Sequence, residues 1–331
     1  MLSGIDLSSD SDLKKYLELG SIDFYKQLES MSPFFQTQWA ARINAKESLS
    51  YQLAVAKVYE QISEYVVARR GQRLRKIALG VQEVLWNLQT LRSHFQCLED
   101  HSLVAALDSA MEFPYDILDY WGGHRSLAQL ICIGGVTQDL SFGGQSSLRL
   151  NLKKLTEEME QISSFIVGDP FLESILKDQL VIPNYVEKTQ FQSGFFKFLE
   201  NDSDRDQFLS YLKTKEKYNI DFKNDAYVRL LLLLFRLVKQ VEVLSQDLVD
   251  IPEGDHRVEV EHLHIPGELF AFSKVEAPSG DLHCYFYSSK IRFSSFGSRI
   301  KPHLNRITNT TSLDVKLSCS SFGLNLNQGA W

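Results

Sequence analysis

Residues 123–140 read GHRSLAQLICIGGVTQDL, and this stretch organises the rest of the sequence. It contains a short apolar run, Leu130–Ile133, which ends in the pair Gly134-Gly135 and is followed by Asp139. An apolar run this short does not allow periodicity to separate a strand from a helix. Paired glycines punctuate regular structure, so we expect a turn at this point.

Long helices are predicted on both sides of this stretch, because apolar residues recur there at three- and four-residue steps. The predicted helices cover about residues 11–31, 36–65, 72–97, 102–120, 148–166, 170–180 and 224–248. We expect a turn at 69–71, a kink or boundary at Pro114 and a loop over 142–147. Asn224 or Asp225 can cap the last helix.

A different pattern follows the turn residues at 251–254. Polar and apolar residues alternate at 256–263 and 282–286, with turn residues at 278–280 between β-like segments. The sequence therefore predicts a mainly α (α+β) fold, a bundle of long helices over 11–250 with a small β unit over 256–300. We expect one structural domain over 11–331, disorder in residues 1–10 and an irregular tail over 301–331.

Composition limits the function classes. The chain has 331 residues and a formal net charge of -7, so a nucleic-acid partner is not expected. The longest apolar run, Leu230–Phe235, is far too short to span a bilayer, so membrane association would have to come through partners. The N-terminus resembles neither a secretory signal nor a transit peptide, which predicts an intracellular protein.

Cysteine spacing disfavours a metal centre or a redox dithiol. The four cysteines are residues 97, 132, 284 and 319, and none forms the close C-x-x-C pair that such sites need. We therefore expect no metal site. Cys132 beside the glycine pair is interpreted as a small buried apolar residue, with a reactive thiol as the alternative.

Other groupings have ordinary explanations and competing functional ones. His262 and His264 are interpreted as surface residues rather than metal ligands. Glu112, Asp116 and Asp119 on a helix are interpreted as a solvated or salt-bridged face rather than an acid–base set. A basic cluster on the second long helix is interpreted as a solvated face, with a contact for acidic partners as the alternative. Its members are Arg69, Arg70, Arg73, Arg75 and Lys76.

Several segments, taken in order, resemble one known family. Residues 123–140 are similar to its G-x-R…I-R-x-G-G-V-x-x-D-L stretch. The other similar segments are 51–57, 70–88, 225–229, 275–282, 290–296 and 312–315. The family comprises the quinone-site subunit of NADH-quinone oxidoreductase (respiratory complex I) and the large subunits of NiFe hydrogenases. The resemblance implies the long-helix bundle of that family.

The resemblance also implies which positions matter. Family positions with a structural or pocket role that are retained here are Arg125, Gly134, Gly135, Asp139, Asp225, Arg229, Glu276, Gly280 and Asp314. No catalytic residue is retained: the quinone-bonding Tyr position is Ala41, and the Arg that faces an iron–sulfur cluster is Cys132. The family's Glu, Arg and His in the following helix correspond to Gly80, Glu83 and Asn87. The family's N-terminal β region has no counterpart, which indicates a divergent, N-terminally truncated relative.

Two functions are compatible with these departures. The first is a complex I-like respiratory assembly in which the chain takes the quinone-site position, degenerate and not catalytic alone. Iron–sulfur and other subunits would then be its partners, and it would lie in the cytoplasm or peripherally on the inner side of the energy-transducing membrane. The second is a non-catalytic paralogue acting as a structural or protein-binding module. The chain itself is expected to bind no cofactor; a quinone is possible only by resemblance, and the cluster would belong to a partner.

Overall fold

The computed structural model describes residues 27–125, 129–167, 169–177, 207, 210, 226–260, 270–278, 280–287 and 290–295. Most of these residues are helical. The helices are α2 (Pro33–Ala40), the short 3-10 helix η1 (Ala45–Glu47), α3 (Ser48–Ile62), α4 (Arg69–Cys97), α5 (His101–Gly122), α6 (Phe142–Ile166), α7 (Pro170–Leu176) and α11 (Ala226–Val249). The strands are β1 (Ile131–Cys132), β2 (Gly135–Val136), β3 (Phe270–Ala277), β4 (Gly280–Tyr287) and β5 (Lys290–Ser295).

The prediction of a mainly helical fold with a small β unit near the C-terminus is confirmed. The unit is an antiparallel sheet with the strand order β3-β4-β5, and Tyr287 at the end of β4 pairs with Lys290 at the start of β5. A second, two-stranded sheet joins β1 and β2 around the glycine pair. The predicted N-terminal disorder, the 301–331 tail and the 11–31 helix, apart from its last residues, lie outside the described residues.

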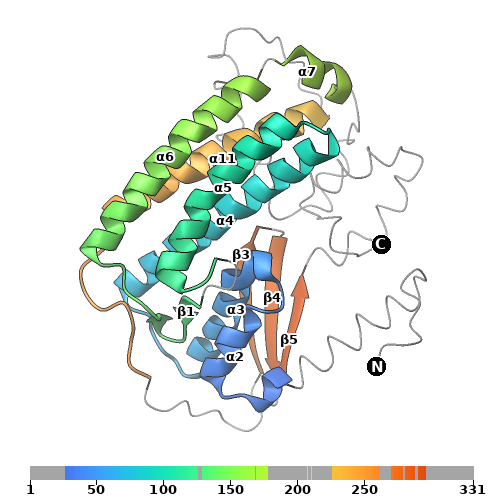
Figure 1. Cartoon of the computed structure of the whole chain (residues 1–331). Coiled ribbons are helices and arrows are strands. Elements are labelled where there is room, and N and C mark those ends of the chain that lie inside the picture. Colours follow the sequence, from blue (N-terminus) through green and yellow to red (C-terminus); the bar gives the residue numbers. More distant parts are fainter. Residues whose placement is uncertain are drawn as a thin grey trace, which may run out of the picture.

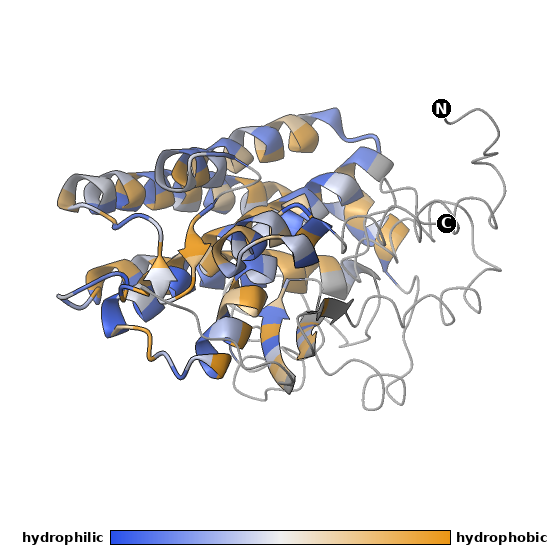
Figure 2. Ribbon diagram, turned by 90° about the horizontal axis from the view of Figure 1, so that it is seen from below, coloured by the Kyte–Doolittle hydropathy of each residue, from blue (hydrophilic) through white to orange (hydrophobic). Residues whose placement is uncertain are grey.

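Four long helices, α4, α5, α6 and α11, form one bundle (Figure 1). Each carries hydrophobic and hydrophilic residues along its length (Figure 2), and the apolar stripes meet in a common core. The run Leu230–Phe235 of α11 is buried, so its uniform hydrophobicity reflects a central place in this core.

Helix α3 connects the bundle with the β unit (Figure 1). It packs against β3 and β4 on one side and against β1 and α4 on others, so most of its residues are buried. Small residues such as Ala54 allow close approach, and the Ser273 hydroxyl donates a hydrogen bond of 2.7 Å to the Ala54 carbonyl.

The predicted helix over 36–65 is broken into α2 and α3, which corrects the expectation from sequence. Asn44 provides the break, because its side chain accepts a hydrogen bond from the Lys46 N–H and caps η1. The first turn of α3 is capped by a residue of another helix: the Leu49 N–H donates to the buried side chain of Gln82 in α4 at 2.7 Å. Residues 41–44 interrupt the helical backbone between α2 and η1.

Two expected interruptions are also wrong, and so is the expected boundary at Pro114, where the alternative of a kink stays a prediction. The residues at 69–71 and 142–147 form the first turns of α4 and α6, where the first backbone N–H groups have no helical partner in any case. Ser141 caps α6 by accepting from the Gly144 N–H. Pro114 lies inside α5, which runs through it. Pro114 is buried, and α5 packs against both α4 and α6, so packing outweighs the lost backbone hydrogen bond.

The β unit begins later than expected. Residues 256–260 form no regular strand; Arg257 makes one isolated antiparallel bridge to Gly135, and the regular strands start at Phe270. The remainder of the predicted 256–263 strand and the pair His262 and His264 lie outside the described residues. The alternation at 256–260 instead reflects a segment that packs against the glycine hairpin on one side.

Candidate functional site

The glycine pair forms the tight turn of the β1–β2 hairpin. Cys132 pairs with Gly135, and Ile133 and Gly134 make the turn between them. Gly134 has a φ of 85°, in the left-handed region that favours glycine. A Cβ on Gly135 would lie 2.1 Å from the carbonyl oxygen of His256. The hairpin therefore needs both glycines, one for its backbone conformation and one for the close approach of 256–258.

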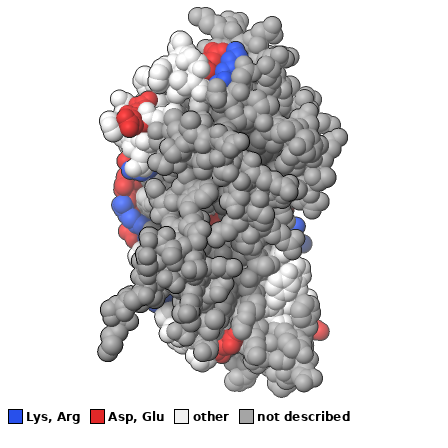
Figure 3. All heavy atoms as spheres, turned by 90° about the vertical axis from the view of Figure 1, so that its right-hand side faces the viewer, with Lys and Arg blue, Asp and Glu red and all other residues white. Residues whose placement is uncertain are grey.

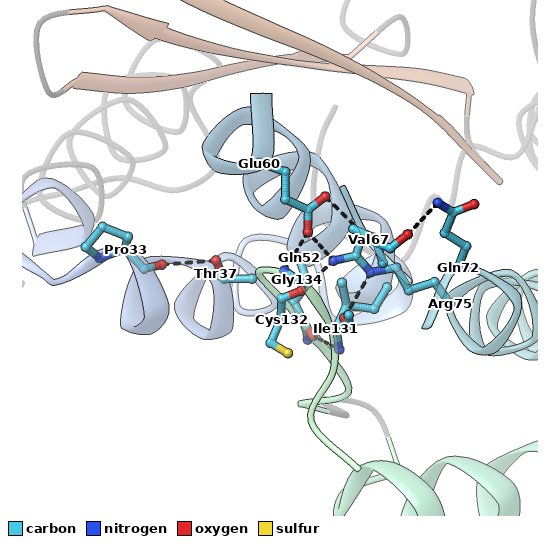
Figure 4. A network of polar contacts seen from close by, with 11 residues as sticks. Pro33, Thr37, Gln52, Glu60, Val67, Gln72, Arg75, Ile131, Cys132 and Gly134 are labelled. Atoms are coloured by element: carbon cyan, nitrogen blue, oxygen red, sulfur yellow. Dashed lines mark hydrogen bonds and ion pairs between the residues drawn. The ribbon is translucent and has the colours of Figure 1, made fainter. Parts of the chain in front are cut away.

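An ion pair between Glu60 of α3 and Arg75 of α4 lies against this hairpin, and both side chains are buried (Figure 4). The guanidinium donates to both carboxylate oxygens of Glu60, one bond being 3.0 Å. It also donates to the carbonyls of Gly135 at 2.9 Å and Cys132 at 2.5 Å. The Glu60 carboxylate accepts a further bond of 2.8 Å from the Gly134 N–H.

These contacts use nearly all the bonding capacity of the pair. Arg75 engages four of its five N–H donors, and Glu60 accepts in a bidentate geometry that suits a planar guanidinium. The nearby Gln52 side chain accepts a bond of 3.0 Å from the Ile131 N–H. Since its lone pairs are taken up by structural donors, the Glu60 carboxylate is fitted to position the hairpin rather than to act as a general base.

Asp139 belongs to a second clamp beside the hairpin. Arg70 donates to Asp139 at 2.9 Å and to the carbonyls of Pro252 at 2.9 Å and Leu140 at 3.3 Å. The segment after α11 and the segment before α6 are thereby held on the first turn of α4. Glu60 bonds to the backbone of Gly134, and Arg75 bonds to that of Gly135. Arg70 pairs with Asp139. The three positions singled out in the sequence are thus held by these side chains.

Cys132 is buried, as predicted for a small apolar residue. Burial raises the pKa of its thiol, and the positive charges of Arg257 and Arg75 only partly oppose this effect. Cys284 of β4 is also buried, and burial raises its pKa to about 12. Both thiols are therefore protonated near neutral pH, and neither has the lowered pKa of a reactive cysteine.

Gly80, Glu83 and Asn87, which the sequence resemblance aligned with the family's Glu, Arg and His, lie along the contact between α4 and α11. A Cβ on Gly80 would lie 2.4 Å from a methyl carbon of Leu244, so Leu244 fills the space beside the glycine. One turn along α4, Glu83 accepts a hydrogen bond from Arg236. Asn87, a further turn along, donates to Gln240. All three positions contact side chains of α11. Ala41, at the Tyr position, is buried at the end of α2.

The interpretation of the basic cluster on α4 as a solvated face is wrong for most of its members. Arg75 is buried with Glu60, Arg70 is held by Asp139, and Arg73 and Lys76 both pair with Asp247 of α11. Since Asp247 near the end of α11 meets the start of α4, the two helices run in opposite directions (Figure 1). The charges serve contacts between elements.

The remaining predicted positions are dispersed. Arg125 is exposed after α5 and pairs with Glu112 at 2.9 Å and Asp116 at 3.0 Å, which confirms the salt-bridged interpretation of those acidic residues. Glu276 is an exposed residue of β3, and Gly280 begins β4. Asp225 and Asp314, together with the side chain of Arg229, lie outside the described residues.

Sequence reasoning missed Glu60 and Gln52 and assigned Arg75 to the wrong environment. One signal was present for Glu60: it continues the series Leu49, Leu53 and Ala56 on the buried face of α3. A charged residue at such a position indicates a buried partner. The identity of that partner could not be inferred from spacing, because Arg75 lies on a different helix.

Across the described ranges, no group of three or more His, Cys, Asp and Glu side chains has the arrangement of a metal site. Likewise, no described helix combines the length and apolarity that crossing a bilayer requires. On the face in Figure 3, the charged residues that the structure describes appear singly or in small groups, and both signs are present. No protein-family model matches the chain, and no curated protein is a significant match to it.

Replacing Gly135 by alanine should destabilise the fold strongly, because the added methyl group overlaps the His256 carbonyl. We expect a loss of at least about 2 kcal/mol in the free energy of unfolding, measured by urea denaturation. Gly143→Ala is the matched control, since a Cβ there meets nothing within 4 Å, and it should be neutral or slightly stabilising. Equal stability of the two variants would refute this close contact.

Replacing Glu60 by glutamine should leave the buried Arg75 charge without its counter-charge. We expect a loss of about 3–5 kcal/mol, measured by the same denaturation. The double variant Glu60→Leu/Arg75→Met should lose less than Glu60→Gln, because it removes the uncompensated charge. The exposed pair Arg125–Glu112 supplies the control, because solvent screens it, and Glu112→Gln should change the stability far less than Glu60→Gln. Similar losses at the two pairs would contradict the assigned burial.

Alkylation of Cys132 should be slow in the folded protein. An unperturbed thiol has a pKa of about 8.5, so at a pH of about 8 the unfolded chain presents a substantial thiolate fraction. Burial raises the folded-state pKa, so the native thiol stays protonated, and stability falls as the pH rises above the unfolded-state value. Iodoacetamide labelling with peptide mass mapping should give at least about tenfold slower modification than in denaturant. Equal rates would mean that Cys132 is accessible.

Proposed function

We propose that the chain is a non-catalytic relative of the family formed by the complex I quinone-site subunit and the NiFe-hydrogenase large subunits, acting as a structural or protein-binding module. The observation that carries the proposal is the packing of α4 against α11. Leu244 occupies the space beside Gly80, Glu83 pairs with Arg236 and Asn87 bonds to Gln240. Side chains committed to these partners cannot at the same time bind a small-molecule substrate.

The chemistry of quinone reduction supports the same proposal. Protonating a reduced quinone requires donors within hydrogen-bond reach of its carbonyl oxygens, together with delivery of electrons from a nearby centre. Ala41 offers no donor, and the buried neutral thiol of Cys132 cannot replace a cationic arginine. The side chains of Ala41 and Cys132 are small and buried, so both suit the packing of a core.

A second candidate function is the quinone-site position within a complex I-like assembly. The order of the similar segments along the chain favours it. The glycine hairpin belongs to one of these segments, and the polar contacts that hold it also favour it. In this case iron–sulfur and other subunits are the partners, and contact with the inner side of an energy-transducing membrane is made through them. Catalysis would depend on those subunits.

Titration of the full chain with decylubiquinone, with the heat of binding measured by calorimetry, tests the first proposal. We expect no saturable binding, because the described side chains at the relevant positions are already paired. The variant Leu244→Ala, which opens space beside Gly80, should gain no catalytic activity because it adds no proton donor. Saturable binding to the unaltered chain that weakens in Asn87→Leu would contradict the non-catalytic proposal. Co-purification with an iron–sulfur protein in equal amounts would favour the second candidate.

A further inference from the structure

One surface of α2 is rich in aromatic residues and arginine. The buried side of the helix carries Gln36, Thr37 and Ala40. The other side carries Phe34, Phe35 and Trp39, and it continues through Arg42 just after the helix. Phe35 is 60 % exposed, whereas Phe34 and Trp39 are half-buried. Arg257, which bridges to the glycine hairpin, lies over the Phe34 ring and extends this surface. The α2 patch comprises Phe34, Phe35, Trp39, Arg42 and Arg257.

The two arginines of the α2 patch differ from most others in the described part of the chain. Six arginines pair with carboxylates: Arg70, Arg73, Arg75, Arg92, Arg125 and Arg236. Arg42 and Arg257 are exposed and make no ion pair with any described residue. Each lies instead over an aromatic ring, Arg42 at 3.9 Å from the centre of Trp39 and Arg257 at 5.7 Å from that of Phe34.

This arrangement leaves charge without a counter-charge on a pre-ordered surface. A guanidinium stacked on a ring keeps its N–H donors at its edge, where a carboxylate can accept two of them. The ring restricts the side chain before binding, which lowers the entropy cost of forming such a contact. Phe35 adds an exposed apolar surface one turn from Trp39. Tryptophan and arginine are also the residue types that contribute most to binding energy in protein interfaces.

We propose that the α2 patch binds an acidic segment of a partner protein, whose carboxylates pair with Arg42 and Arg257 and whose apolar side chains cover Phe35. The patch is small: an eight-residue helix is about 12 Å long, which suits a short linear segment better than a whole domain. Two cations on a chain of net charge -7 are too few for a polyphosphate backbone. Phe35 is the one large apolar side chain of the α2 patch that is mostly exposed, which is little area for insertion into a membrane surface.

The proposal builds on the protein-binding role proposed above and is tested by a different measurement. Peptides would be selected from a random display library on the full chain, and their affinities measured by fluorescence polarisation. We expect enriched peptides to carry Asp or Glu beside apolar residues. Their affinity should fall at least about tenfold for Arg42→Glu and for Phe35→Ser. Replacing the peptide carboxylates by lysine should restore binding to Arg42→Glu, which a merely unfolded variant could not reproduce.

Phe171→Ser supplies the matched control, because Phe171 is equally exposed on α7, outside the patch, and should leave the affinity unchanged. The proposal is overturned if no peptide is enriched, if enriched peptides lack acidic residues, or if Arg42→Glu binds them equally well. Arg42-dependent binding to phosphatidylserine vesicles or to an oligonucleotide, with no acidic peptide selected, would assign the surface to another partner and overturn it too. Failure here leaves the quinone titration unaffected, so the two proposals can fail separately.

Discussion

The Glu60–Arg75 ion pair determines how the two parts of the structure meet. It joins α3, which supports the sheet, to α4, which begins the bundle, and it holds the hairpin between them through backbone groups. Burying two charges is costly unless each finds several partners, and here the hairpin supplies them. The carbonyls must therefore lie where Arg75 can reach them. That requirement explains why a turn with two glycines is fixed at this place rather than a longer loop.

The long helices could be predicted because their apolar residues repeat with the helical period, and their buried stripes follow from that repeat. The ends of the helices and the interruptions between them could not be predicted in this way. The gap between α2 and α3 depends on Asn44 and on a cap from Gln82 of another helix. Conversely, Pro114 breaks a local rule, but the packing of α5 against α4 and α6 outweighs it. Local signals describe what a segment prefers alone, whereas Gln82 and the helices that pack against α5 are distant in sequence from the residues that they affect.

Of the candidate site, only the backbone turn could be predicted from the sequence. Gly134 and Gly135 stand out in the sequence, because adjacent glycines after an apolar run indicate a turn. The side chains that hold the turn are far from it in sequence. Glu60 and Arg75 belong to helices whose general pattern is apolar or basic, and charge clusters are usually solvated. Only the folded arrangement distinguishes Arg75, which is buried, from Arg69, which is exposed.

Under the family descent proposed above, the contact between α4 and α11 explains how a reaction is lost without loss of the fold. Gly80 has no side chain, and Leu244 fills the space beside it, so the core is filled. Glu83 and Arg236 are partly buried and pair with each other, so neither charge lacks a partner. Both positions are satisfied within the same helix pair. Placing the proposed family's Glu at Gly80 would overfill the contact, and its Arg at Glu83 would leave Arg236 unpaired, so this packing supports the structural role proposed above.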